Sequence, residues 1–291
     1  MKKDIINLFC FIDDFTNECK KELKKHALGV CNKSTPTRIP GLTESEVVTI
    51  ILMFQESPCR NFKFFYNSYL KLYKDEFPEM PTYERFVSLM PRVFIILLAL
   101  LSTLLAPNKG LSYVDSTSLA VCHSKRISRN KVFRGIAALG KTTKGWFLGL
   151  KLHLIVDEKG ELIKVKLTPG NVDDRSVLPK MTKNITGFLF GDKGYISKKL
   201  FLSLYKRGLK LVTGIKRSMK NFLLPLNEKI FLRKRSIIET VFDYLKNKLQ
   251  LEHTRHRSPL NAIIHIISTL ISYQLKPSKP AILNSYFIAN P

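Results

Sequence analysis

The hydrophobic pattern of the chain changes near residue 110, and this change constrains the fold more than any other feature. Before it, apolar residues recur at helical spacing. After it, the run Trp146–Val156 alternates, so that its apolar side chains share one face, as in a β-strand. A turn at Gly160 and a second alternating run, Leu162–Leu167, predict a β-hairpin. We therefore expect a helical first part and a second part that contains a sheet.

Helix signals and breakers follow each other closely in the first part. Thr43 and Glu46 form a capping-box pattern ahead of an apolar run, and Thr82 can cap a later helix. Aromatic residues recur at helical spacing within Asn61–Tyr73. Short helices joined by tight breaks are compatible with a helix-turn-helix-like module that binds DNA. An all-helical packing domain without DNA contacts is the equally weighted alternative.

Strand and helix signals alternate in the second part, which predicts an α/β domain with a mixed sheet and helices packed on it. The expected strands are 111–114, 146–156, 162–167, 187–190 and 209–215, and the expected helices begin at 171 or 173, 197, 231 and 259 and end near 183, 207, 251 and 275. With a linker at 106–111, the predicted division is a helical region 1–108, an α/β domain 109–278 and a tail 279–291.

Two features bear on the cellular compartment. The most apolar run, Val93–Ala106, has 14 residues, which is short for a membrane span and favours a buried helix. The five cysteines, among them Cys31 and Cys122, are scattered without a Cys-x-x-Cys pair. They indicate free thiols in a reducing compartment and argue against a structural zinc site. We expect a cytoplasmic protein that is not associated with a membrane.

Positive charge is concentrated in the second part. The chain has 48 Lys and Arg against 23 Asp and Glu, a formal net charge of +25. Residues 1–110 hold 15 basic and 12 acidic residues, which leaves 33 and 11 for the rest of the chain. A compact body so positive repels itself unless it meets a polyanion, and nucleic acid is the first candidate partner.

Three carboxylates in this basic part stand at positions of chemical interest. Asp115 follows the first expected strand, Asp192 follows another, and Glu239 lies inside the long expected helix. Acids at neighbouring strand ends can converge at one sheet edge, and a helix can add a third. Such oxygen ligands suit magnesium or manganese, and two of these ions can catalyse an in-line phosphodiester displacement.

Each acid also has a structural interpretation that, taken alone, is at least as probable. Asp115 can be a turn residue or a cap, because three hydroxyl residues follow it. Asp192 can belong to a plain turn with Lys193. Glu239 can pair with Arg235, four residues earlier on the same helical face. Only the combination of all three favours a catalytic site.

The long expected helix presents Arg235, Glu239 and Lys246 along one face, a cation, an acid and a cation. Asp243 is a rival acid one turn after Glu239. A further basic run follows Asp115, and the absence of acids around it favours phosphate contacts. Its members are Lys125, Arg126, Arg129, Lys131 and Arg134.

Some other residues receive a weaker interpretation. Asp173 and Asp174 are expected to be helix caps. Trp146 begins a strand and is expected in the core rather than as a surface for base stacking. His153, on the strand face opposite Leu152 and Leu154, has no assigned task.

Four separated motifs, in this order, resemble a DDE transposase of a bacterial insertion sequence. They are Tyr113-Val114-Asp115-Ser116, Thr168-Pro169-Gly170-Asn171-Val172-Asp173-Asp174, Gly191-Asp192-Lys193-Gly194-Tyr195, and Arg235-Ser236-Ile237-Ile238-Glu239 through Lys246. The last motif is similar to the family's YREK pattern, except that Leu232 stands where a tyrosine is expected. The likeness is strongest to insertion-sequence family 982, over about residues 42–258.

The resemblance implies a ribonuclease H-like catalytic fold in which Asp115, Asp192 and Glu239 bind two divalent metal ions, Mg or Mn. It also implies that Arg235 and Lys246 contact DNA near the active site, with Lys193, Lys125 and Arg126 as further DNA-binding candidates. Glu239 follows Asp192 by 47 positions, which leaves no room for a large insertion domain.

The function expected from the residues and the resemblance together is cleavage of insertion-sequence ends and joining of their 3′ hydroxyl groups to target DNA. The partner is double-stranded DNA, and a homodimer or larger assembly is expected on DNA, because two ends must be held together. Two alternatives stay open: a non-catalytic or decayed DNA-binding protein, and a structure-specific nuclease on the same fold.

Overall fold

The computed structural model describes residues 2–26, 41–143, 145–215, 219, 223–253 and 255–281. By the packing of its backbone the chain forms two compact units. The first, the helical unit, comprises residues 1–104 and 258–275; the second, the sheet unit, comprises residues 105–257 and 276–291. Cys31 and most of the predicted tail 279–291 lie outside the described residues.

The helical unit is built around a helix that is buried on nearly every side. The helices of this unit are α1 (Lys2–His26), α2 (Glu44–Glu56), α3 (Phe62–Phe64), the π-helix η1 (Phe65–Tyr69), the 3-10 helix η2 (Leu70–Tyr73), α4 (Tyr83–Leu89), the 3-10 helix η3 (Met90–Val93), α5 (Phe94–Leu104) and α10 (Pro259–Leu275). The predicted capping box is present, since Thr43 and Glu46 exchange side-chain and backbone hydrogen bonds. After it, α2 is apolar all round, which suits a central helix packed against α1 and α10.

The last described helix of the chain belongs to this unit and not to the sheet. α10 packs on α2 and α5. Inside that contact the buried side-chain amide of Gln55 hydrogen-bonds Ser268, Thr269 and a ring nitrogen of His265. The predicted α/β domain 109–278 included this helix, whereas in the structure residues 258–275 pack with the helical unit. Hydrophobic periodicity predicted the bounds of α10, but periodicity does not say which partner covers an apolar face.

One helical stretch, Tyr83–Leu104, is long and apolar enough to cross a membrane by length and composition alone. This is weak evidence for a span, because core helices of soluble proteins meet the same criteria. Within α5 four residues, Ile96, Leu97, Leu100 and Leu101, are buried, whereas Ile95 is 51% exposed. α5 therefore packs along one side.

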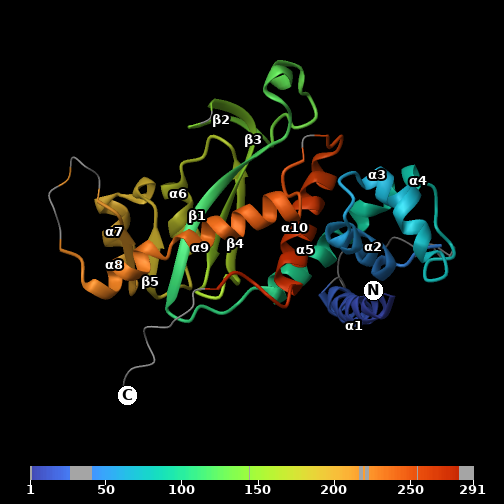
Figure 1. Cartoon of the computed structure of the whole chain (residues 1–291), viewed down its shortest axis with the longest axis horizontal. Helices are drawn as coiled ribbons and strands as arrows, with labels where there is room; N and C mark the ends of the chain where they lie inside the picture. Colours follow the sequence, from blue (N-terminus) through green and yellow to red (C-terminus); the bar gives the residue numbers. More distant parts are fainter. Residues whose placement is uncertain are drawn as a thin grey trace. The chain divides into compact units, whose positions relative to one another are not determined.

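The sheet unit holds a six-stranded mixed sheet (Figure 1). Its strands are β1 (Leu111–Ala120), β2 (Ala138–Thr142), β3 (Gly145–Val156), β4 (Leu162–Pro169), β5 (Gly187–Gly191) and β6 (Leu209–Thr213). β3 pairs antiparallel with β1 along one edge, and shares its other edge between β2 and β4. β5 is parallel to β1, and β6 is parallel to β5. The predicted α/β class with a mixed sheet and flanking helices is confirmed.

Helices cover both faces of this sheet. α6 (Asp174–Met181) and α7 (Lys198–Tyr205) enclose one apolar core with side chains of β1, β3, β4, β5 and β6. α9 (Ser236–Asp243) packs on β1, and α8 (Leu226–Arg233) packs on β5 and β6. The remaining short elements are the 3-10 helices η4 (Ser124–Arg129) and η5 (Lys193–Tyr195) and the π-helix η6 (Tyr244–Lys248).

The structure corrects two predicted elements next to the site. β1 extends through Ala120, so Asp115 lies inside the strand and not after it. Backbone pairing with β3 holds the polar run after Asp115 in the strand despite its hydroxyl residues. The single helix expected over 231–251 is three helices, because the chain turns at Lys234 and Arg235 between α8 and α9, and α9 passes into η6.

Candidate active site

The predicted acids come from three elements of the sheet unit. Asp115 is in β1, Asp192 directly follows β5, and Glu239 lies in the first turn of α9. In the parallel ladder of β1 and β5, Leu111 pairs with Phe188 and Tyr113 with Phe190. The same offset relates Asp115 to Asp192, so the sheet register carries the two acids to neighbouring strands at the same level.

Asp115 is on the face of the sheet that α9 covers. It is paired with Leu154 across the antiparallel ladder, and directly opposed residues share a face. Its side chain is 24% exposed, and one of its oxygens accepts a hydrogen bond from the backbone N–H of Ser116 at 2.8 Å. Asp115 is thus a half-buried carboxylate under a helix, and its position is more enclosed than that of a surface turn residue.

The pKa of Asp115 is raised to about 6, chiefly by burial. The Ser116 N–H and the Arg235 guanidinium oppose this rise, whereas the charges of Asp192 and Glu239 add to it. The other two predicted acids therefore both act electrostatically on Asp115. A carboxyl group whose pKa is raised by burial and by neighbouring acids is typical of functional sites.

Arg235 lies between two of the acids. Its guanidinium is 2.7 Å from Glu239 and 3.5 Å from Asp115, nitrogen to oxygen. The pairing of Glu239 with Arg235, which the sequence offered as a structural alternative, is therefore present. Within the described ranges of the chain, no three His, Cys, Asp or Glu side chains form a group that could hold a metal ion. The donor chemistry of the three carboxylates fits Mg or Mn, while Arg235 bridges two of them.

The side chain of Asp192 does not cap the short helix that follows it. Asp192 is exposed beside Lys193, which is also exposed and whose aliphatic part lies along Gly214 at the end of β6. Below them the ring of Tyr195 is buried in the core that α6 and α7 enclose. Asp192 is therefore an exposed residue at the start of a turn that the buried Tyr195 anchors.

Lys246 is held within the sheet unit itself. Its Nζ donates to the backbone carbonyl of Ser118 at 2.8 Å and lies 3.4 Å from Glu252. Glu252 in turn accepts a hydrogen bond from the backbone N–H of Ala120. These contacts fasten η6 to the end of β1, so Lys246 has a structural task that the helix spacing did not reveal. The rival acid Asp243 is exposed and accepts a hydrogen bond from Asn247.

The predicted basic run lies on and after η4, in the connection between β1 and β2. Lys125 and Arg126 are exposed there. Within the described part of the chain, no hydrogen bond or ion pair joins these two residues to the three carboxylates. The expectation that Trp146 is a core residue is wrong: it is 59% exposed and Lys141 lies over its ring at 5.6 Å.

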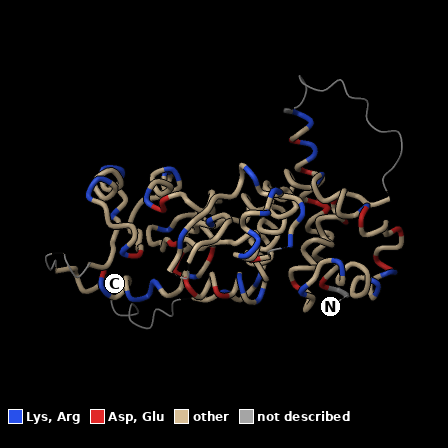
Figure 2. The backbone as a smooth tube through the Cα atoms, turned by 90° about the horizontal axis from the view of Figure 1, so that it is seen from above, with Lys and Arg blue, Asp and Glu red and all other residues tan. Residues whose placement is uncertain are grey.

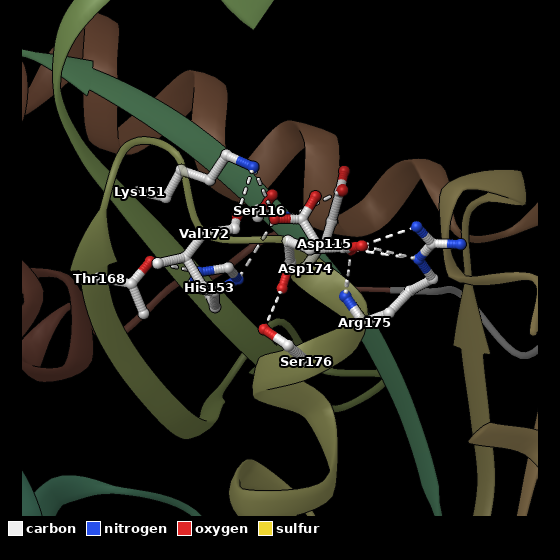
Figure 3. A network of polar contacts seen from close by, with 10 residues as sticks. Asp115, Ser116, Lys151, His153, Thr168, Val172, Asp174, Arg175 and Ser176 are labelled. Atoms are coloured by element: carbon white, nitrogen blue, oxygen red, sulfur yellow. Dashed lines mark hydrogen bonds and ion pairs between the residues drawn. The ribbon is translucent and has the colours of Figure 1, made fainter. Parts of the chain in front are cut away.

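Sequence reasoning missed a second polar cluster on the opposite sheet face (Figure 3). There Lys151 and His153 of β3 converge on Asp174, at 3.0 Å and 3.8 Å. His153 also hydrogen-bonds Thr168 at 2.9 Å, and Asp173, as predicted, caps α6. Alternation along β3 could have shown Lys151 and His153 to share a face, but the helix cap that meets them is distant in the sequence.

The comparisons with known proteins agree with this arrangement. The family model described as "Transposase DDE domain" matches residues 105–259, more than half of the chain. The chain belongs to the DDE transposase domain family. The matched segment contains all three predicted acids. The narrower likeness to insertion-sequence family 982 stays a prediction.

Solved structures with low sequence identity are also similar to the chain. One is a cryo-EM structure of the piggyBac transposase synaptic complex with hairpin DNA, with 10% identity, a TM-score of 0.49, and coverage of 86% of this chain and 69% of that chain. Another is a crystal structure of the Mos1 strand transfer complex, with 12% identity, a TM-score of 0.24, and coverage of 87% and 83%. No curated protein sequence matches the chain.

The α/β class predicted for this DDE domain, a mixed sheet with flanking helices, is confirmed, and its ribonuclease H-like character stays a prediction. Three antiparallel strands, β4, β3 and β1, are continued by the parallel strands β5 and β6, with helices on both faces. The preceding region is helical, as expected.

Proposed function

We propose that the protein is a DNA transposase that cleaves insertion-sequence ends and joins their 3′ hydroxyl groups to target DNA by two-metal phosphodiester transfer. One observation carries the proposal. Within a segment that belongs to the DDE transposase domain family, the charges of Asp192 and Glu239 both act on the half-buried Asp115 and contribute to its raised pKa. Three interacting carboxylates in a basic domain oppose DNA binding unless cations join them.

Asp115, Asp192 and Glu239 are the residues that would hold two divalent ions, Mg or Mn. When bound, such ions activate the attacking oxygen and stabilise the leaving oxygen of an in-line displacement. Arg235, 21% exposed, is placed to bind a DNA phosphate once it releases Glu239. Lys193 and Lys246, and the exposed Lys125 and Arg126, are the further candidates for contact with DNA.

The ionisation of Asp115 follows from its pKa of about 6. At pH 7 and above, the Asp115 carboxyl group is ionised in most molecules and can act as a ligand. No side-chain nucleophile is required, because water serves for nicking and a liberated 3′ hydroxyl for joining. The partners are double-stranded DNA at the inverted-repeat ends and at the target. A dimer or larger assembly on DNA, in the bacterial cytoplasm near the nucleoid, completes the proposal.

A joining assay tests this function. Oligonucleotides carry the inverted repeats from the DNA that flanks the gene, and are incubated with protein and magnesium or manganese. We expect metal-dependent joining by the wild type. Asp192→Asn removes one carboxylate charge and should lower joining at least a hundredfold while end binding stays within threefold, since Asp192 makes no capping bond.

Asp243→Asn is the matched control, because Asp243 is an exposed acid of the same unit whose side chain accepts a hydrogen bond from Asn247, one helical turn later. It should join at the wild-type rate. Near-normal joining by Asp192→Asn would refute the assignment of the three acids. End binding without cleavage by the wild type would support the non-catalytic alternative, and cleavage that ignores the end sequence would support the nuclease.

A further inference from the structure

A cavity at the outer edge of the sheet unit is lined mainly by lysines. It has a volume of about 270 Å³ and lies between β4 and the C-terminal end of α6. Four lysines, Lys164, Lys166, Lys180 and Lys183, line it together with Asn184, next to the buried Met181. We call this feature the lysine cavity.

The described lining of the lysine cavity carries no compensating negative charge. No Asp or Glu lines it, and none of its four lysines forms an ion pair within the described residues. Four ammonium groups around one small space repel one another, and solvent screening reduces this cost without removing it. An arrangement of this kind is stabilised by an anion that enters the cavity.

The electrostatics of the α6 helix explains the position of only one of the four cavity lysines. Lys180 lies in the last turn of α6, where a cation complements the carbonyl end of the helix. Lys164 and Lys166 come from β4, and Lys183 follows the helix. The antiparallel pairing that sets the register of β4, and the packing of α6 on β4, bring these separate segments together.

The lysine cavity is separate from the three acids. Lys166 is opposite His153 in the ladder of β3 and β4, and His153 is opposite Ser116 in the ladder of β1 and β3. These residues face the same side of the sheet as α6, whereas Asp115, the neighbour of Ser116, faces α9. A ligand in the lysine cavity therefore does not occupy the place of the substrate at Asp115.

We propose that the lysine cavity binds a phosphate group of the DNA backbone outside the catalytic centre. Lysine ammonium groups bind phosphate as compact point charges, and the Asn184 amide can donate a further hydrogen bond. The cavity is near the lower end of the size range of small-molecule sites, so it admits a phosphate with part of a sugar. The phosphate chemistry follows from the cavity; DNA as its source rests on the proposed function. Free inorganic phosphate is the other source.

Lysine footprinting on the wild-type full-length chain tests the proposal. Exposed lysines are acetylated and quantified by mass spectrometry, alone, with duplex DNA, and with inorganic pyrophosphate. We expect duplex DNA to reduce labelling of the four cavity lysines at least fivefold, and the protection to fall as salt rises. Four exposed lysines of the same unit serve as the internal control and should label as before. They are Lys159, Lys198, Lys199 and Lys206.

Two charge-matched variants extend the test. One changes the four cavity lysines to Gln, and the other changes the four control lysines to Gln, so that net charge falls equally. Removal of one phosphate contact reduces the slope of log affinity against log salt by about 0.9. We expect this slope to become shallower by about one in the cavity variant, and to keep its wild-type value in the control variant.

Each outcome decides the proposal. Protection by duplex DNA, with a shallower slope in the cavity variant alone, supports it. Protection by pyrophosphate but not by DNA overturns DNA as the source and leaves a site for free phosphate. Labelling unchanged by either anion, or an equally shallow slope in both variants, overturns the site. If the wild type joins no DNA, the pyrophosphate arm still tests the cavity, so failure of the proposed function is recognised separately.

Discussion

At the scale of single residues, Arg235 places one positive charge between two of the three acids. Its guanidinium pairs with Asp115 and Glu239 and opposes the rise in the pKa of Asp115 that burial causes. Residue types and spacing predicted that Arg235, Glu239 and Lys246 share a helix face. They could not predict that Lys246 is committed to the carbonyl of Ser118, because that contact spans 128 residues of sequence.

His153, on the sheet face that α6 covers, should make the stability of the protein depend on pH. Burial is the main reason that its pKa falls to about 4, and the cations Lys151 and Lys166 add to this, whereas Asp174 opposes it. Between pH 6.5 and 4 the unfolded chain binds a proton at this position and the folded chain does not. The free energy of unfolding should therefore fall as pH is lowered through this window, by at most about 3.5 kcal/mol from this residue.

Urea titrations across that pH range check the prediction. His153→Gln should remove this part of the pH dependence, while His123→Asn, a change at an exposed histidine, should keep the wild-type profile. A His153→Gln variant whose stability falls as steeply as that of the wild type would contradict the assignment.

At the scale of elements, local signals predicted most of the sheet unit. The hairpin of β3 and β4 and the cap at Asp173 are where turn and capping residues predicted them, and α7 begins directly after residue 197, where a helix was expected to begin. β2 was missed, because its five residues contain glycine and pair with β3 only in the folded protein. The break before α9 was missed too, since neither Lys234 nor Arg235 signals a helix end.

Gly149 in the middle of the sheet gives a prediction about an element. A Cβ atom added there would be 2.0 Å from the backbone carbonyl oxygen of Leu119, which is a backbone clash and not a side-chain one. Gly149→Ala should force β3 away from β1 and lower the free energy of unfolding by about 1–3 kcal/mol. Gly194→Ala, where no described atom lies within 4 Å, should leave the denaturant midpoint unchanged. Equal midpoints for the two variants would contradict the close approach.

α10 gives a second prediction about elements. Gln55 and the apolar faces of α2 and α5 are covered by α10, which is separated from α5 in sequence by the sheet unit. A fragment of residues 1–108 alone should therefore lack cooperative thermal unfolding, whereas the same fragment joined to 258–275 by a flexible linker should regain it. Circular dichroism melts of both compare them directly. A cooperative transition in the shorter fragment would show that α10 is dispensable there.

At the scale of the whole molecule, the net charge of +25 predicts that salt has opposite effects on thermal stability and on DNA binding. Figure 2 shows Lys and Arg positions, in blue, along both units of the chain. Charge composition alone predicted a polyanion as partner, because composition needs no knowledge of the fold. Composition could not predict where lysines without acidic neighbours gather, as in the lysine cavity, because their positions depend on the strand register.

Salt should stabilise the protein without DNA and weaken its binding to DNA. From about 50 to about 500 mM sodium chloride, screening reduces self-repulsion, so Tm should rise by several degrees. The affinity for duplex DNA should fall steeply over the same range, because each phosphate contact releases a counterion. Calorimetry and fluorescence anisotropy measure the two quantities. A Tm that falls with salt would show that attractive ion pairs outweigh the repulsion.

The return of the chain from the sheet to α10 has a consequence for synthesis. A ribosome translates the first helices early, yet their buried faces stay uncovered until the segment 258–275 has emerged. Any premature stop or frameshift before that point yields a product whose first helices lack their cover, even when all three acids have been made. The helical unit can therefore fold completely only if the ribosome has translated the correct reading frame through α10.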